Sequence, residues 1–156
     1  VHLVIVTALH FEMKKEQIIE ALESFNPHEK FILSYKLVSG AKVIDDGDTS
    51  NPKGFSAIIT LGKSYKANRK ILVTPGIVDL GDDSKQIHND LAVQSQNVFD
   101  SVVYVGESGI EEFKSVFGDE LLTSEEQLRE VVSILNETDL VIIEGRMPTW
   151  ALKYLR

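Results

Sequence analysis

The 156-residue sequence contains no cysteine and only four histidines. Without cysteine the chain can form neither a disulfide framework nor a thiolate metal site, which fits a reducing compartment and predicts a cytoplasmic protein. The histidines are isolated in the sequence, and no two have the spacing of a zinc ligand pair (His2, His10, His28 and His88). We therefore expect no metal site within this chain.

Basic residues are also scarce, because 16 Lys and Arg stand against 24 Asp and Glu, giving a net charge of −8. Binding to nucleic-acid phosphates needs clustered cations, so we expect no nucleic-acid partner. The longest apolar run covers residues 1–11, and it is far short of the roughly 20 residues that span a bilayer. We therefore expect no membrane segment. Because the chain opens with Val1 inside that run, we interpret it as a fragment of a longer protein.

Motifs for phosphate binding and for nucleophilic catalysis are missing too. Gly62-Lys63-Ser64 matches the end of a phosphate-binding loop, but Ala57 stands where that loop needs a glycine. The tripeptide also ends a predicted helix, whereas the loop must open one. The sequence has no Gly-x-Gly-x-x-Gly fingerprint and no Gly-x-Ser-x-Gly elbow. If the chain belongs to an enzyme, we expect it to supply positioning and not covalent chemistry.

What the sequence does contain is an alternation of short apolar runs with longer amphipathic segments. Strands are predicted at 31–38, 41–44, 71–73, 102–105 and 140–143, and helices at 14–25, 52–65, 84–99, 110–117, 125–135 and 148–155. Ser124 and Gln127 form a capping box that opens one of these helices. Apolar strands separated by helices predict an α/β fold with a Rossmann-like, mostly parallel sheet flanked by helices.

The N-terminal part of the chain has a different pattern. Residues 1–13 favour a buried helix, although the β-branched run Val4-Ile5-Val6-Thr7 favours a strand locally. A second helix follows, and residues 26–30 are the one stretch with the composition of a linker. We therefore predict two parts: a helical tail at 1–27 that belongs to a preceding domain, and a Rossmann-like domain at 28–156.

Candidate ligand residues lie where the predicted strands end, because open α/β sheets bind ligands beyond the carboxyl ends of their strands. After one strand, Asp45-Asp46 could bind a ribose diol, a metal or an ammonium group. An equally good interpretation is that the segment 46–51 only caps the next helix. After another strand, Thr74-Pro75-Gly76 either lets the backbone approach a ligand closely or forms a tight turn.

Two further residues could have either a functional or a purely structural role. Arg146 follows Gly145 at the end of a strand, and it could grip a carboxylate through two hydrogen bonds. The alternative is a surface ion pair with Glu144 or Asp139. His88 lies between apolar positions of a predicted helix, where we expect a hydrogen-bonded histidine without a chemical role.

These strand ends resemble the C-terminal domain of the Mur ligase family. The run from Asp45 to Pro52 is similar to the family's Asp-Asp-x-Tyr-Asn-(Ala/Ser)-Asn-Pro. Residues 73–81 are similar to Val-Thr-Pro-Gly-Met-Val-Glu-Leu-Gly, and residues 139–146 to Asp-x-Val-Leu-x-Lys-Gly-Ser-Arg. The most similar members are those that add D-alanyl-D-alanine to a UDP-muramoyl tripeptide.

The resemblance implies the last domain of an ATP-dependent, amide-forming ligase of peptidoglycan synthesis. ATP and magnesium would be bound mainly by a missing central domain, where ATP phosphorylates a substrate carboxylate before an amine attacks it. The present domain would close over the nucleotide and position the incoming amino acid or dipeptide, and alone it would be inactive. The resemblance assigns nucleotide binding to Asp45, Asp46, Asn51 and Pro52, and substrate binding to Thr74, Pro75, Gly76, Gly145 and Arg146. The implied partners are these small molecules and the missing N-terminal and central domains.

Some positions differ from the family pattern. Asp48 and Thr49 replace a tyrosine and an asparagine, and Glu144 replaces a lysine. These changes motivate an alternative hypothesis, in which the chain is a degenerate, non-catalytic ligase-like module that binds a protein partner or a wall precursor.

Overall fold

The computed structural model describes residues 2–24 and 32–156, and the chain divides into two compact units, 1–31 and 32–156. The linker predicted at 26–30 lies outside the described residues. Within the two described ranges, every helix is too short or too polar to cross a lipid bilayer.

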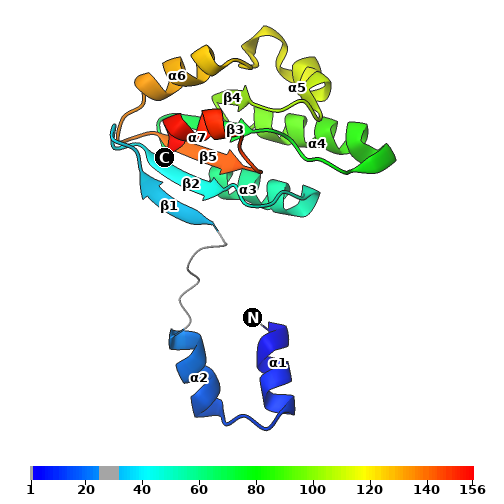
Figure 1. Cartoon of the computed structure of the whole chain (residues 1–156), viewed down its shortest axis with the longest axis vertical. Coiled ribbons are helices and arrows are strands. Elements are labelled where there is room, and N and C mark those ends of the chain that lie inside the picture. Colours follow the sequence, from blue (N-terminus) through cyan, green and yellow to red (C-terminus); the bar gives the residue numbers. More distant parts are fainter. Residues whose placement is uncertain (1, 25–31) are drawn as a thin grey trace. The chain divides into compact units, whose positions relative to one another are not determined.

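The first unit consists of two helices, α1 (His2–His10) and α2 (Lys15–Ser24) (Figure 1). The helix predicted near the N-terminus is confirmed over residues 2–10, despite the β-branched run, but its expected burial is not, because Val4, Val6 and Leu9 are exposed. Among the described side chains of this unit only Ile18 is buried. Large apolar side chains are exposed on both helices and on the segment between them: Val4, Val6, Leu9, Phe11, Met13, Ile19 and Leu22. The described side chains of this unit therefore form almost no core, although helices in proteins are stabilised mainly by tertiary packing.

The second unit is built on a five-stranded sheet with the strand order β1-β2-β5-β3-β4. Its edge strand β1 (Leu33–Lys36) runs antiparallel to β2 (Lys42–Asp46). The strands β5 (Leu140–Glu144), β3 (Lys70–Thr74) and β4 (Ser101–Tyr104) continue the sheet in parallel. The predicted α/β fold with a mostly parallel sheet is therefore confirmed.

Helices cover both faces of the sheet (Figure 1). One face carries α3 (Pro52–Ser64) and α4 (Ser84–Gln96), and α5 (Ile110–Phe117) packs against α4. The other face carries α6 (Glu125–Ser133) and α7 (Thr149–Leu155). Single 3-10 turns at Gly81–Asp83 and Gly118–Glu120 precede α4 and follow α5.

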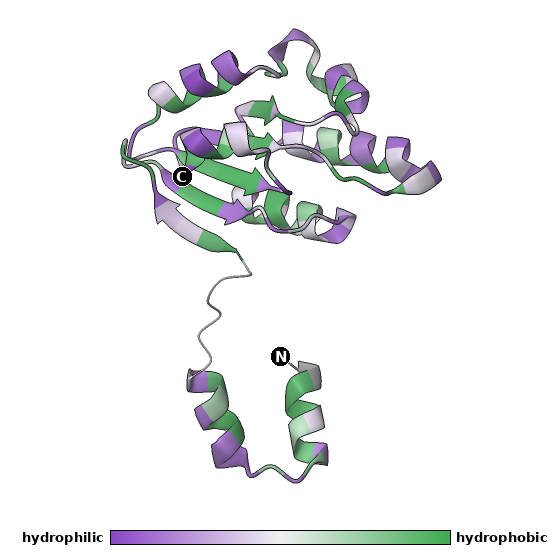
Figure 2. Ribbon diagram, viewed as in Figure 1, coloured by the Kyte–Doolittle hydropathy of each residue, from purple (hydrophilic) through white to green (hydrophobic). Residues whose placement is uncertain are grey.

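The alternation of side chains along each strand fills two separate cores, one on each face. In β5, Ile142 packs with α3 and α4, whereas Ile143 packs with α6 and α7. All five residues of β5 are buried, because it is a central strand with both faces covered. Figure 2 shows the resulting pattern, with apolar strands in the middle and polar outer faces on the helices.

Local signals set the element boundaries. The predicted capping box is confirmed: the Ser124 hydroxyl accepts from the Gln127 amide at 3.1 Å, and the Gln127 side chain accepts from the Ser124 amide at 3.0 Å. β1 and β2 form a hairpin whose turn contains Gly40, and its φ of 88° suits glycine. The strand predicted at 31–38 is shorter than expected, since β1 covers only Leu33–Lys36.

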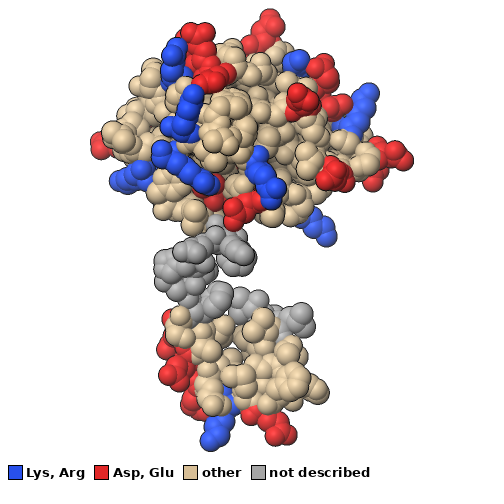
Figure 3. Space-filling view, in the orientation of Figure 1, with Lys and Arg blue, Asp and Glu red and all other residues tan. Residues whose placement is uncertain are grey.

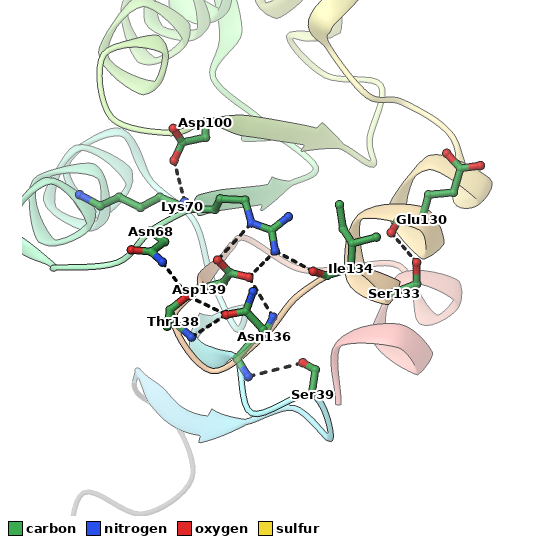
Figure 4. Close-up of polar contacts among 12 residues, drawn as sticks. Ser39, Asn68, Lys70, Asp100, Glu130, Ser133, Ile134, Asn136, Thr138 and Asp139 are labelled. Atoms are coloured by element: carbon green, nitrogen blue, oxygen red, sulfur yellow. Dashed lines mark hydrogen bonds and ion pairs between the residues drawn. The ribbon is translucent and has the colours of Figure 1, made fainter.

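An ion pair ties the amino ends of two central strands together (Figure 4). Arg69 precedes β3 and donates from Nη2 to Asp139, which precedes β5, at 2.5 Å. Its Nε donates to the same carboxylate at 3.1 Å, and the Asn136 amide donates to it at 2.8 Å. The Arg69 hydrogen bonds lower the pKa of the Asp139 carboxyl, although its burial acts in the opposite direction.

We predict that Asp139→Asn lowers the urea midpoint of unfolding at neutral pH, because the substitution leaves the guanidinium without its bidentate partner. The pKa of Asp139 is depressed in the folded state, so its stabilisation is present above the ordinary value of 3.8 and is lost as the pH falls. The difference between variant and unsubstituted chain should therefore shrink in acid. Glu111→Gln, which breaks the exposed pair with Lys114, is the control and should leave the midpoint unchanged.

Candidate functional site

Three loops meet at the carboxyl ends of the central strands. They follow β2, β3 and β5, which are neighbours in the sheet and run in parallel, so their loops emerge at the same edge. Together these loops surround a cleft of about 400 Å³, lined by Asp48, Thr49, Ser50, Pro75, Gly76, Val78 and Arg146. The sequence predicted ligand residues on all three loops, and the structure brings the loops together.

A larger open hollow of about 710 Å³ lies at the opposite edge of the sheet, near Lys42, Tyr65 and Asp139. We take the smaller cleft as the candidate site for a physical reason. In open α/β sheets the amides, turns and polar side chains that bind ligands converge beyond the carboxyl ends of the strands.

Asp45 lies at this edge but points away from the cleft. Its carboxylate accepts from Arg156 Nη2 at 2.9 Å, from the Tyr35 hydroxyl at 3.2 Å and from the Gly47 amide at 3.0 Å. With only 2% of its surface exposed, it anchors the end of α7 to β2. Asp46 points to the other face, and burial, followed by the charges of Asp45 and Asp48, raises its pKa. Neither residue lines the cleft.

Asn51 and Pro52 begin helix α3. The Asn51 side chain accepts from the Gly54 amide at 2.9 Å, and Pro52 occupies the first turn, where a missing amide hydrogen costs nothing. The capping interpretation of this segment is therefore confirmed for Asn51. Nucleotide binding by Asn51 and Pro52 stays a prediction, as it does for Asp45 and Asp46.

The loop after β3 supplies one wall of the cleft. Thr74 is fully buried, and its hydroxyl accepts from the Gly76 amide at 3.1 Å. Pro75 and Gly76 line the cleft, and Gly76 has a φ of 77°. The loop after β5 packs onto this wall, because a Cβ on Gly145 would meet the Pro75 ring at 3.2 Å.

Arg146 is exposed and lines the cleft. The ion pairs proposed as alternatives are absent, since Asp139 binds Arg69 and Glu144 binds Ser50. Within residues 2–24 and 32–156, Arg146 forms no salt bridge. Its guanidinium therefore offers hydrogen-bond donors to an anionic group in the cleft.

Glu144 is the residue whose state the sequence did not predict. It ends β5 and is 1% exposed, although its type is almost always solvated. Its Oε1 accepts from the Ser50 hydroxyl at 2.7 Å, and its Oε2 has no hydrogen-bond partner. Burial, reinforced by the charge of Asp46 and opposed by the Ser50 hydrogen bond, raises the pKa of Glu144 to about 8.

His88 and Ser108 hold the loop after β3 through contacts with Ile77 that the sequence did not predict. The Ile77 amide donates to Nε2 of the buried His88 at 3.1 Å, and the Ile77 carbonyl accepts from the Ser108 hydroxyl at 2.7 Å. His88 Nδ1 lies 2.8 Å from the Ser84 carbonyl, so both ring nitrogens have partners. The prediction of a hydrogen-bonded histidine is confirmed, and the loop it fixes is part of the cleft. No sequence signal connects Ser108 with this loop, because it follows a different strand.

Comparison with protein-family models finds no match, and comparison with curated proteins finds none either. Solved structures do match. The MurF ligase from Thermotoga maritima in complex with ADP superimposes with a TM-score of 0.69 and 20% identity, covering 88% of this chain and 32% of that one. MurF from Acinetobacter baumannii gives a TM-score of 0.71 and 21% identity over 95% of this chain and 34% of its own. This chain has the Mur ligase C-terminal fold.

A third structure supports the same assignment of fold. It is the UDP-N-acetylmuramoylalanyl-D-glutamyl-2,6-diaminopimelate–D-alanyl-D-alanyl ligase from Acinetobacter baumannii, with a TM-score of 0.65 and 19% identity over 95% of this chain. The chain thus spans about one third of the length of the Mur ligases that it matches. The candidate cleft lies at the carboxyl edge of this Mur-type sheet.

The surface of the Mur-type domain carries charges of both signs. In Figure 3, Lys and Arg side chains are interspersed with Asp and Glu on the visible face. In the part of the chain that the structure describes, no group of three or more His, Asp or Glu side chains could hold a metal ion. Gly62-Lys63-Ser64 lies at the end of α3, so it is not a phosphate-binding loop, as predicted.

Proposed function

We propose that this chain is the C-terminal part of an ATP-dependent, amide-forming Mur-type ligase. Such a ligase adds an amino acid or D-alanyl-D-alanine to a UDP-muramoyl peptide in cytoplasmic peptidoglycan synthesis. The observation that carries the proposal is the likeness of fold to Mur ligases across 88% to 95% of this chain. The sequence similarities at 45–52, 73–81 and 139–146 support it, because these segments form the loops around the cleft or lead into them.

The two-unit organisation also supports the proposal. Residues 1–27 would be the helical end of the central domain, and residues 28–156 the C-terminal domain. The apolar side chains that α1 and α2 leave exposed need a further surface to cover them, as expected for helices taken from another domain's core. That central domain would bind ATP and magnesium, since this chain has no phosphate-binding loop.

In this reaction ATP activates a substrate carboxylate, and an incoming amine then displaces phosphate. The role of the present chain is closure and positioning, which excludes water and aligns the amine. Arg146 would hold a carboxylate at the cleft, beside the wall formed by Thr74, Pro75 and Gly76 and the close approach of Gly145. Asp46 would contact ribose, with Asp45, Asn51 and Pro52 shaping the nucleotide side.

The proposal is tested with the intact parent protein. Phosphate release is measured with ATP, a UDP-muramoyl tripeptide and D-alanyl-D-alanine, and again with each component left out. We expect release only when all three are present. An intact parent that stays inactive with all three, and with single amino acids in place of the dipeptide, would rule the proposal out.

A variant pair sharpens this experiment. Arg146→Ala should raise the KM for the dipeptide about tenfold or more, because a charge-assisted hydrogen bond is lost. Arg129→Ala removes another exposed arginine, from α6, which lies on the opposite face of the sheet from Glu144 and α3, and should leave the KM unchanged. If the two substitutions changed the KM equally, Arg146 would not be a binding residue for the dipeptide.

A further inference from the structure

Glu144 lacks the partner that a buried carboxyl group normally has. Arg69 and Arg156 bind the two other strongly buried carboxylates of the sheet, Asp139 and Asp45. Among the described residues no Lys, Arg or His forms an ion pair with Glu144, and one of its oxygens has no hydrogen bond. Burying an unpaired carboxylate costs folding free energy, so a glutamate at the end of a central strand calls for a functional explanation.

Ser50 connects this carboxyl group to the cleft. The Ser50 side chain lines the cleft, and its hydroxyl donates to Glu144 Oε1 at 2.7 Å. A serine hydroxyl has one hydrogen and two acceptor lone pairs. Because the hydrogen is engaged by Glu144, Ser50 presents only acceptor capacity to the cleft.

The rest of this wall is also an acceptor. Asp48, which carries a carboxylate, also lines the cleft, whereas the amide of Gly76, another lining residue, already donates to the Thr74 hydroxyl. The guanidinium of Arg146 is the donor group on the remaining side. The wall formed by Asp48 and Ser50 therefore suits a group rich in N–H donors and carrying a positive charge.

We propose that this wall, with Glu144 directly behind Ser50, recognises the ammonium group of a ligand, and that entry of this group displaces the proton of Glu144 to solvent. The ionised carboxylate then supplies the countercharge, transmitted through the Ser50 hydroxyl. This inference rests on the proposed function, in which the ligand is an amino acid or dipeptide, and it adds the residues that bind the amino group of that ligand.

Asp46, the register partner of Glu144 on β2, is the charged group that acts on its proton. The neighbouring segments also carry Asp48 on the loop after β2, Lys53 in the first turn of α3 and Arg146 after β5. Burial and the negative charge of Asp46 hold the proton on Glu144 when the cleft contains no cation. An added positive charge favours the ionised form, so binding should tighten as the pH rises through the titration of Glu144.

The test uses the 156-residue chain with methylammonium chloride as a probe that keeps its charge over the whole range. The ¹³C resonance of the Glu144 carboxyl and the Ser50 and Asp48 amides are followed by NMR. We expect saturable binding that is at least about tenfold tighter near pH 9 than near pH 6, with a lower titration midpoint of Glu144 in the presence of the probe.

Two variants and one control make the result decisive. Glu144→Gln keeps the shape of the side chain and should abolish the pH dependence, and Ser50→Ala should weaken binding at high pH. Glu130→Gln, at an exposed position of α6, should change neither. Any one of three results would overturn the proposal: NMR shifts that do not saturate with the probe, a titration midpoint of Glu144 that the probe leaves unchanged, or binding that does not depend on pH. Phosphate release by the parent protein is a separate readout, so the ligase assignment can hold when this inference fails.

Discussion

Gly76→Ala is expected to destabilise the second unit by about 2 to 5 kcal/mol. Gly76 has a φ of 77°, where a side chain costs about 1 to 2 kcal/mol in any surroundings. In addition, a Cβ built on Gly76 would overlap the Tyr104 hydroxyl and the Ser108 carbonyl oxygen. The backbone strain and the steric overlap both destabilise the folded state, and both arise in the loop that forms one wall of the cleft.

Neither neighbour can move away easily. Tyr104 is 1% exposed and its ring packs 4.7 Å from that of Phe113. Ser108 holds the Ile77 carbonyl through its hydroxyl, so a shift of its backbone would also release that loop. We therefore expect a displaced loop and not a local adjustment.

Gly81→Ala is the matched control. Gly81 also has a positive φ, of 59°, but an added Cβ would meet no atom within 4 Å. Its substitution should lower the free energy of unfolding only through the strain of a side chain at positive φ, by about 1 to 2 kcal/mol. Chemical denaturation of the three proteins measures the difference. If both substitutions cost the same, the packing against Tyr104 and Ser108 contributes nothing to the stability of the loop.

Much of the fold follows from local signals in the sequence. The short apolar runs predicted β2, β3, β4 and β5, because strands with helices on both faces are mostly apolar. The helix boundaries followed from capping residues such as Ser124 and from Pro52. The three site loops were predictable for a topological reason, since parallel strands end at one edge.

The roles of individual side chains were not predictable in the same way. Asp45 and Asp46 are adjacent and chemically identical, yet one faces α7 and the other faces α3, and only the register of β2 decides which. The buried Glu144 carboxyl accepts its hydrogen bond from Ser50, which lies 94 residues away. His88 and Ser108 act on Ile77 from two other segments, so their function depends on tertiary contacts that no sequence window contains.

Glu144 should make the stability of the chain fall as the pH rises. Its pKa is raised from 4.5 in the unfolded chain to about 8 in the folded state. Its contribution is therefore fully present below the unfolded value and is lost as the pH rises through the folded value. One pKa unit corresponds to about 1.4 kcal/mol, so the loss between these values is at most about 5 kcal/mol.

Glu144→Gln removes the titration and should remove this loss. We expect the variant and the unsubstituted chain to be similarly stable near pH 5 and the variant to be clearly more stable near pH 9, by a few kcal/mol at most. Urea unfolding at a series of pH values measures the difference, and the exposed substitution Glu130→Gln should follow the unsubstituted chain throughout. Parallel profiles for all three proteins would show that Glu144 is already ionised at neutral pH. A divergence through the titration of Glu144 would show that this buried carboxyl group carries a proton at neutral pH.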